Sequence, residues 1–217
     1  MIGVRPQFSH VDGKVWLLLG GSRVQRIDIA TGQWLPESIS VFKYIAKDSP
    51  AAARPHAIYD IFTDSQNNCY FSDLGSEYIG KVDAKTLKVT FYQVPTMSSF
   101  PRRAHFDKQD RLWFAEYLGN KMAMFDPKTE RFQEWPMPNA FNWPYDVVLD
   151  KNDYAWTAGM VSDHASRLNT KTGEFVEYLL PRFANIRHVE ADNSTNPPSL
   201  WVGANHQGVI IRVEPLE

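Results

Sequence analysis

The sequence lacks the features that would place it in several common classes of protein. Its single cysteine, Cys69, excludes an internal disulfide and any metal site built from several thiolates. No apolar run approaches the roughly 18 residues that a membrane-spanning helix needs, and residues 1–6 lack the basic-then-apolar order of a signal peptide. The net charge is −2 and no basic run is present. We therefore expect neither a nucleic acid nor a membrane as a partner.

Motifs of several well-known chemistries are also missing. The chain has no Gly-rich phosphate loop, no serine nucleophile elbow and no His-Glu-x-x-His segment. Aromatic residues, in contrast, are abundant, with seven Trp, nine Tyr and thirteen Phe among 217 residues. They fall in short apolar runs bounded by Asp, Asn, Gly or Pro, a pattern typical of strands. The sequence predicts an all-β protein in which Cys69, within such a run, is a buried bystander.

A repeat runs through the whole chain. An aromatic residue recurs in the second predicted strand of each unit, and an acidic or amide residue closes the third strand with nearly the same spacing of 43 to 55 residues. Four strands in a period of about 40–45 residues are typical of a propeller blade rather than a helical solenoid. We interpret the recurring aromatic residues as packing between blades; they are Trp16, Tyr70, Trp113, Trp156 and Trp201.

The repeat predicts one β-propeller domain over residues 1–217, with about five four-stranded antiparallel blades. The predicted blades cover residues 5–46, 54–97, 100–138, 143–181 and 185–217, with a loop insertion at 35–53. A proline opens the first four, at Pro6, Pro55, Pro101 and Pro144, and Ile186 takes its place in the fifth.

The fifth predicted blade lacks its outer strand, because the sequence ends after the third strand of that repeat. An unpaired strand edge exposes backbone donors and acceptors and invites association. Two arrangements follow as hypotheses. Either further blades precede this chain in a seven-bladed propeller, of which it is the C-terminal part, or the edges are covered by self-association.

The repeat motifs resemble those of the streptogramin (virginiamycin B) lyase family. The resemblance lies in Arg54-Pro55-His56-Ala57-Ile58, in Trp113-Phe114-Ala115-Glu116 and in Ile79-Gly80-Lys81-Val82-Asp83. It implies a seven-bladed propeller with a site over the central channel. There, a Mg²⁺ held by two glutamates and a histidine base open an ester-linked cyclic peptide by elimination. The resemblance also implies a bacterial protein of the periplasm or cell exterior.

The last blade departs from the family at its functional positions. The first glutamate, the histidine base and the metal glutamate fall on Asn185, Arg187 and Ala204, and His188 is one residue out of register. Two functions therefore stay open. One is a non-catalytic propeller that binds a small ligand or a protein; the other is a metal-dependent C–O lyase or lactonase-like enzyme.

Residues near the start of each blade's first strand differ between repeats, unlike core positions. They predict a positively charged channel mouth that suits a small anionic molecule, such as a carboxylate or phosphate, or a protein. The alternative is that these side chains are solvated or paired with one another. The predicted ligand-binding residues are Arg102, Arg103, Tyr145, Asp146, Arg187 and His188.

A second group of residues supports the alternative that the protein is an enzyme. His56 and Glu116 are the candidate catalytic residues, and Asp73 and Glu116 are the candidate metal ligands. Oxygen ligands suit Mg²⁺ or Ca²⁺, and a histidine titrates near neutral pH. The competing interpretation is that Asp73 and Glu116 form ion pairs with the neighbouring arginines.

Overall fold

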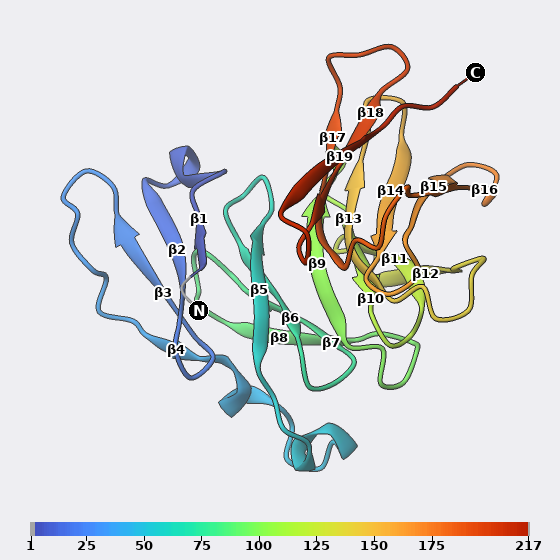
Figure 1. Ribbon diagram of the computed structural model, residues 1–217. Coiled ribbons are helices and arrows are strands. Elements are labelled where there is room, and N and C mark those ends of the chain that lie inside the picture. Colours follow the sequence, from blue (N-terminus) through green and yellow to red (C-terminus); the bar gives the residue numbers. More distant parts are fainter. Residues whose placement is uncertain (1–2, 217) are drawn as a thin grey trace. The chain divides into compact units, whose positions relative to one another are not determined.

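Five antiparallel sheets follow one another along the chain in a computed structural model that describes residues 3–216 (Figure 1). Each sheet is built from consecutive strands. Among residues 3–216, four sheets have four strands and the last has three, which confirms the all-β blade organisation and the three-stranded last blade. Within residues 3–216, no helix is long and apolar enough to cross a membrane. The chain divides into two compact units, residues 1–101 and residues 102–217.

The N-terminal unit holds the first two sheets. The first consists of β1 (Gly3–Arg5), β2 (Lys14–Leu19), β3 (Arg23–Asp28) and β4 (Ile39–Ser40). The second consists of β5 (Ile58–Thr63), β6 (Cys69–Asp73), β7 (Tyr78–Val82) and β8 (Val89–Gln93). A short 3-10 helix, η1 (Ser9–Val11), follows β1, while η2 (Val41–Tyr44) and η3 (Pro50–Ala53) lie in the insertion between the two sheets.

The C-terminal unit holds the other three sheets. The first consists of β9 (Pro101–Phe106), β10 (Leu112–Glu116), β11 (Lys121–Asp126) and β12 (Arg131–Pro136). The next consists of β13 (Pro144–Leu149), β14 (Tyr154–Gly159), β15 (His164–Asn169) and β16 (Phe175–Leu179). The last consists of β17 (Ile186–Asp192), β18 (Ser199–Ala204) and β19 (Val209–Val213).

Three of the recurring aromatic residues, Trp16, Trp113 and Trp156, pack against the first strand of the following sheet, as the repeat predicts. Trp16, Tyr70, Trp113 and Trp156 are at most 1% exposed, whereas Trp201 in the three-stranded sheet is 39% exposed. The Trp156 indole donates its N–H to Asp150 at 2.8 Å, and Trp113 makes the equivalent bond to Asp107 at 2.9 Å. Each indole therefore buries its ring without leaving a polar atom unpaired.

A bulge recurs in the first strand of three blades, where two residues lie opposite a single residue of the second strand. It lies between Ile58 and Ile61 in β5, between Pro144 and Val147 in β13, and between Ile186 and Val189 in β17. Bulges commonly re-aim side chains at the edges of functional sites. The two residues at each bulge are Tyr59-Asp60, Tyr145-Asp146 and Arg187-His188.

The observed strand boundaries differ from the sequence-based alignment in the first two blades. Pro101 and Pro144 do begin their strands, but Pro55 lies three residues before β5, and Pro6 follows β1. The prediction that a proline opens the first two blades is therefore wrong. Its consequence is that His56 precedes its strand, while Asp60 takes the position that Asp146 holds in the fourth blade.

Candidate functional site

Asp146 on β13 lies at the centre of a cluster in the C-terminal unit. Its side chain is fully buried, and it accepts hydrogen bonds from His188 Nδ1 at 2.7 Å and from His105 Nε2 at 3.1 Å. The backbone N–H of Val189 adds a third bond at 3.3 Å. His105 belongs to β9 and His188 to β17. One carboxylate thus joins the first strands of three consecutive blades.

The electrostatics of this cluster keep Asp146 ionised. Burial by itself would raise the pKa of Asp146, but the hydrogen bonds from His105 and His188 outweigh it and hold that pKa well below its usual range. The hydrogen bond to Asp146 raises the pKa of His188, with burial and Arg103 opposing and Glu190 assisting. His188 therefore stays protonated to a higher pH than an ordinary histidine, which suits a cation better than a general base.

Arginine and aromatic side chains gather beside this cluster. The Arg102 guanidinium lies 4.4 Å from the ring centre of Tyr117 and 5.8 Å from that of Tyr145. Tyr117 also contacts Trp143, with ring centres 5.2 Å apart. Burial raises the pKa of Tyr117, and the positive charges of Arg102 and Arg187 oppose that rise. Both guanidiniums are therefore close to this aromatic group.

All six predicted ligand-binding residues lie in this unit, near the start of β9, β13 and β17. The structure brings Asp146 together with His188, and Arg102 together with Tyr145. It also places Arg103 near enough to His188 to influence its charge. Their role in binding a ligand stays a prediction.

The candidate catalytic residue His56 lies in the N-terminal unit and is held by Asp73. The Nδ1 atom of His56 is 2.5 Å from Asp73 Oδ2, which also accepts a bond from Ser76 Oγ at 2.5 Å. Backbone N–H groups of residues 57 and 75 bond the other oxygen of Asp73, and Phe42 stacks on the His56 ring at 4.9 Å. Asp73 thus orients His56 and has both oxygens engaged by donors.

The candidate metal ligands lie in different units. Asp73 ends β6 in the N-terminal unit, and Glu116 ends β10 in the C-terminal unit; both are fully buried. Across residues 3–216, no three His, Cys, Asp or Glu side chains are grouped so that they could hold a metal ion. The roles of Glu116 and Asp73, and the Mg²⁺ or Ca²⁺ that they would bind, remain predictions.

Reasoning from the sequence missed His105, which shares Asp146 with His188. It also missed the equivalent pair in the N-terminal unit, where Arg5 Nη2 lies 2.6 Å from Asp60 Oδ1. The signal was present, because Tyr59-Asp60 and Tyr145-Asp146 are the same dipeptide in the same place of the repeat. Aligning the blades on their prolines concealed it.

Comparisons with known proteins bear on the fold. No protein-family model and no curated protein sequence matches the chain. A streptogramin B lyase structure is 20% identical, with a TM-score of 0.71 over 95% of this chain and 66% of that one. A catalytically inactive histidine-to-alanine variant of virginiamycin B lyase from Staphylococcus aureus, solved with quinupristin, is 16% identical, with a TM-score of 0.74 over 99% of this chain and 70% of that one.

The chain has the β-propeller fold of the streptogramin B lyases. It spans about two thirds of the length of the lyase chains that it matches. The same fold extends to the extracellular domain of a one-component system from B. thetaiotaomicron, at 16% identity and a TM-score of 0.66, over 89% of this chain and 25% of that one. The resemblance seen in the repeats is thus confirmed, and at these identities it concerns the fold alone.

Proposed function

We propose that this β-propeller binds a small anionic molecule, without catalysis, where β9, β13 and β17 of the C-terminal unit begin. The observation that carries the proposal is the set of cationic groups at equivalent repeat positions on the two blades that flank the blade of Asp146. Arg102 and Arg103 occupy them on β9, and Arg187 and His188 occupy them on β17. Four such groups on the two strands that flank β13 give a positively charged surface that suits a carboxylate or a phosphate.

Arg187 is the residue of this group most available to a ligand. Its side chain is exposed, and it forms no ion pair or hydrogen bond within the part of the chain that the structure describes. A guanidinium presents a planar fork of donors that matches carboxylate and phosphate oxygens. Asp146 raises the pKa of His188, so below that pKa His188 adds a second positive charge on the same strand.

Binding is favoured over catalysis by the chemistry of the same residues. A histidine whose pKa is raised is a poor proton acceptor near neutral pH. Arg187 and Ala204 also stand where the lyase resemblance implies a base and a metal ligand. Since the fold also occurs in the extracellular domain of a one-component system, likeness to a lyase does not require catalysis.

Calorimetric titration with inorganic phosphate, and separately with oxalate, at about pH 6 tests the proposal. We expect saturable binding that weakens as salt is added, because the charges are partly exposed. Arg187→Gln should weaken it about tenfold, or about 1.4 kcal/mol, the scale of one hydrogen bond from a charged group. Arg131→Gln, an exposed arginine at the start of β12, is the matched control and should bind as the wild type does. Wild-type protein that binds neither probe would refute the proposal.

The metal-dependent lyase is the second candidate, and the observation in its favour is the buried pairing of His56 with Asp73. Carboxylate-oriented histidines are common general bases. Incubation with quinupristin and Mg²⁺, followed by chromatographic separation of cyclic and linear forms, tests it. Ring opening that His56→Ala abolishes would establish the enzyme and overturn the non-catalytic proposal. An unchanged cyclic compound would remove this alternative for that substrate.

A further inference from the structure

Tyr117 brings a hydroxyl group to the cationic residues of the C-terminal unit. It directly follows β10, its side chain is partly exposed, and its hydroxyl makes no hydrogen bond to any of residues 3–216. The Arg102 guanidinium lies 4.4 Å from its ring centre, and the charge of Arg187 acts on the hydroxyl. Because burial raises the pKa of Tyr117, the hydroxyl keeps its proton at neutral pH and can donate it to an anion.

Tyr117 also contacts two other aromatic rings. Its ring centre is 5.2 Å from that of Trp143 and 5.6 Å from that of Tyr145, with interplanar angles of 60° and 81°. Tyr145 is buried, whereas Trp143 and Tyr117 are partly exposed. The cationic groups therefore border an aromatic surface that solvent reaches in part.

Hydrogen bonds of Asn120 fix the segment that carries Trp143. The Asn120 side chain accepts the backbone N–H of Trp143 at 3.0 Å and donates to the carbonyl of Asn139 at 2.8 Å. The backbone N–H of Met160 donates to the carbonyl of Trp143 at 3.1 Å. These bonds hold Trp143 at a left-handed φ of 52°, which a bulky residue adopts only where its surroundings enforce it. The aromatic surface is thus preformed, and a ligand need not order it.

Exposed apolar side chains extend this surface. Leu118, next to Tyr117, is 45% exposed, and Phe141, two residues before Trp143, is 72% exposed. Both belong to the two segments that Asn120 ties together. Apolar surface beside cationic groups suits a ligand that is anionic at one end and apolar at the other.

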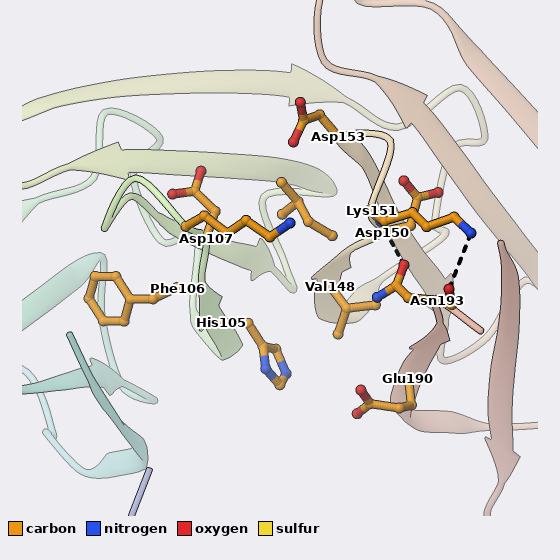
Figure 2. A pocket seen from close by; sticks show the side chains of 11 residues that line it. His105, Phe106, Asp107, Val148, Asp150, Lys151, Asp153, Glu190 and Asn193 are labelled. Atoms are coloured by element: carbon orange, nitrogen blue, oxygen red, sulfur yellow. Dashed lines mark hydrogen bonds between the residues drawn. The ribbon is translucent and has the colours of Figure 1, made fainter. Parts of the chain in front are cut away.

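The opposite ends of β9, β13 and β17 are more acidic. A cavity of about 320 Å³ lies there, and four carboxylates line it against the ammonium groups of Lys108 and Lys151 (Figure 2). The four belong to Asp107, Asp150, Asp153 and Glu190. Even with Arg111, which pairs with Asp107 at 2.7 Å, the carboxylates outnumber the cations. An anion is therefore less favoured at that end than beside Arg102 and Arg187.

We infer that the ligand of the proposed anion site is a small aromatic carboxylate. Its carboxylate accepts hydrogen bonds from the Tyr117 hydroxyl and the Arg187 guanidinium, and its ring packs against Trp143. Tyr117 and Trp143 thus select for a ring beside the charge. The inference rests on the proposed function, since it names the class of ligand for the same site.

Two-dimensional ¹H–¹⁵N NMR titration with benzoate, acetate and benzamide at about pH 6 tests the inference. Acetate has the charge without the ring, and benzamide has the ring without the charge. We expect benzoate to bind about tenfold more tightly than acetate, and benzamide to cause no saturable shift. The indole N–H resonance of Trp143 should shift with benzoate, whereas that of Trp34 in the N-terminal unit should not.

Two substitutions separate the role of the hydroxyl from that of the ring. Tyr117→Phe keeps the ring beside Arg102 and should weaken binding of both benzoate and acetate about fivefold, as expected for loss of one hydrogen bond to a charged group. Trp143→Leu should reduce the advantage of benzoate over acetate to about twofold and leave acetate binding unchanged. Tyr44→Phe and Trp34→Leu replace exposed aromatic residues of the N-terminal unit and should bind both anions as the wild type does.

The outcomes separate this inference from the proposed function. Saturable binding of phosphate or oxalate, with benzoate no tighter than acetate, would overturn the inference and leave the proposed function standing. The inference is also overturned if benzamide binds as tightly as benzoate, if a folded Tyr117→Phe protein binds benzoate as the wild type does, or if Trp143→Leu keeps the full advantage of benzoate. If none of the anions binds, both fail.

Discussion

Asp60 in the N-terminal unit and Asp146 in the C-terminal unit occupy the same place in their blades but have different cationic partners. Asp60 accepts a bond from Arg5 at 2.6 Å, and Asp146 accepts bonds from His105 and His188. In both units, one partner comes from the first strand of the preceding blade. The repeat therefore conserves the contact between blades while its chemistry changes from a permanent positive charge to a titratable one.

The difference places the response to pH in one unit. A guanidinium keeps its charge throughout the pH range in which a histidine titrates, so the Arg5–Asp60 pair lacks this alkaline response. The ring of His188 can lose its proton, and Arg103, Glu190 and Asp146 are the charged groups that set when it does. Three predictions test this contrast.

Removal of Asp146 should have the largest effect. Asp146→Ala leaves two histidines and a buried backbone N–H without their acceptor, and should lower the free energy of unfolding by about 2–3 kcal/mol. That is below the ~3–5 kcal/mol for breaking a fully buried pair, because His105 and His188 are partly exposed. Urea denaturation near pH 6 measures it. Asp60→Ala is the matched variant in the N-terminal unit, and a loss below 1 kcal/mol for Asp146→Ala would contradict the central role of this carboxylate.

The pH dependence should be smaller and confined to the C-terminal unit. The His188–Asp146 pair contributes its full stability below the ordinary histidine pKa of about 6.5, and this contribution is lost as pH rises through the raised pKa of His188. On the acid side, the contribution of Asp146 is complete above about pH 3.9 and is lost as pH falls through its lowered pKa.

Hydrogen exchange, corrected for intrinsic rates, measures this effect by segment. Protection of β13 and β17 should fall on the alkaline side, whereas that of β5 beside Arg5 should not respond to this titration. His188→Gln should remove the alkaline loss. An identical pH response in β5 and β17 would show that the titration is not local.

Exchange of the partner in the N-terminal unit should have the smallest effect. Arg5 donates to Asp60 and also to the carbonyl of Ile61 at 2.6 Å, and a histidine can reproduce only part of this. Arg5→His should cost about 1 kcal/mol and give β5 an alkaline loss of protection that the wild type lacks. Arg5→Lys, which keeps the charge, should be comparably destabilised but insensitive to pH between about 6 and 9. Equal pH responses in Arg5→His and Arg5→Lys would show that the response does not come from titration of the introduced histidine.

Most of the fold could be predicted because the residues that recur along the sequence are buried packing residues. Trp16, Tyr70, Trp113 and Trp156 fill equivalent buried places, so their spacing reports the blades directly. The boundaries of the first two blades could not be placed in the same way. A proline fixes only its own backbone angle, and neither Pro6 nor Pro55 is part of a strand.

The candidate site was predicted in part for a related reason. The variable positions Arg102, Arg187 and His188 stand out because core positions repeat and they do not. His105 escaped notice because it lies further along β9 than these positions, and its partner Asp146 is one of the two residues at the β13 bulge. Contacts between neighbouring blades depend on such local irregularities, which a repeat period does not encode.

The indole hydrogen bonds have a practical consequence for experiments. Asp107 and Asp150, which accept the N–H groups of Trp113 and Trp156, also line the cavity, whereas Trp16 bonds the backbone carbonyl of Asn67. A change in the charge of Asp107 or Asp150 would alter the field at its own indole, whereas Trp16 has no carboxylate acceptor. Tryptophan emission thus reports on the surroundings of these two carboxylates without any added label, beside the signal of the other five tryptophans.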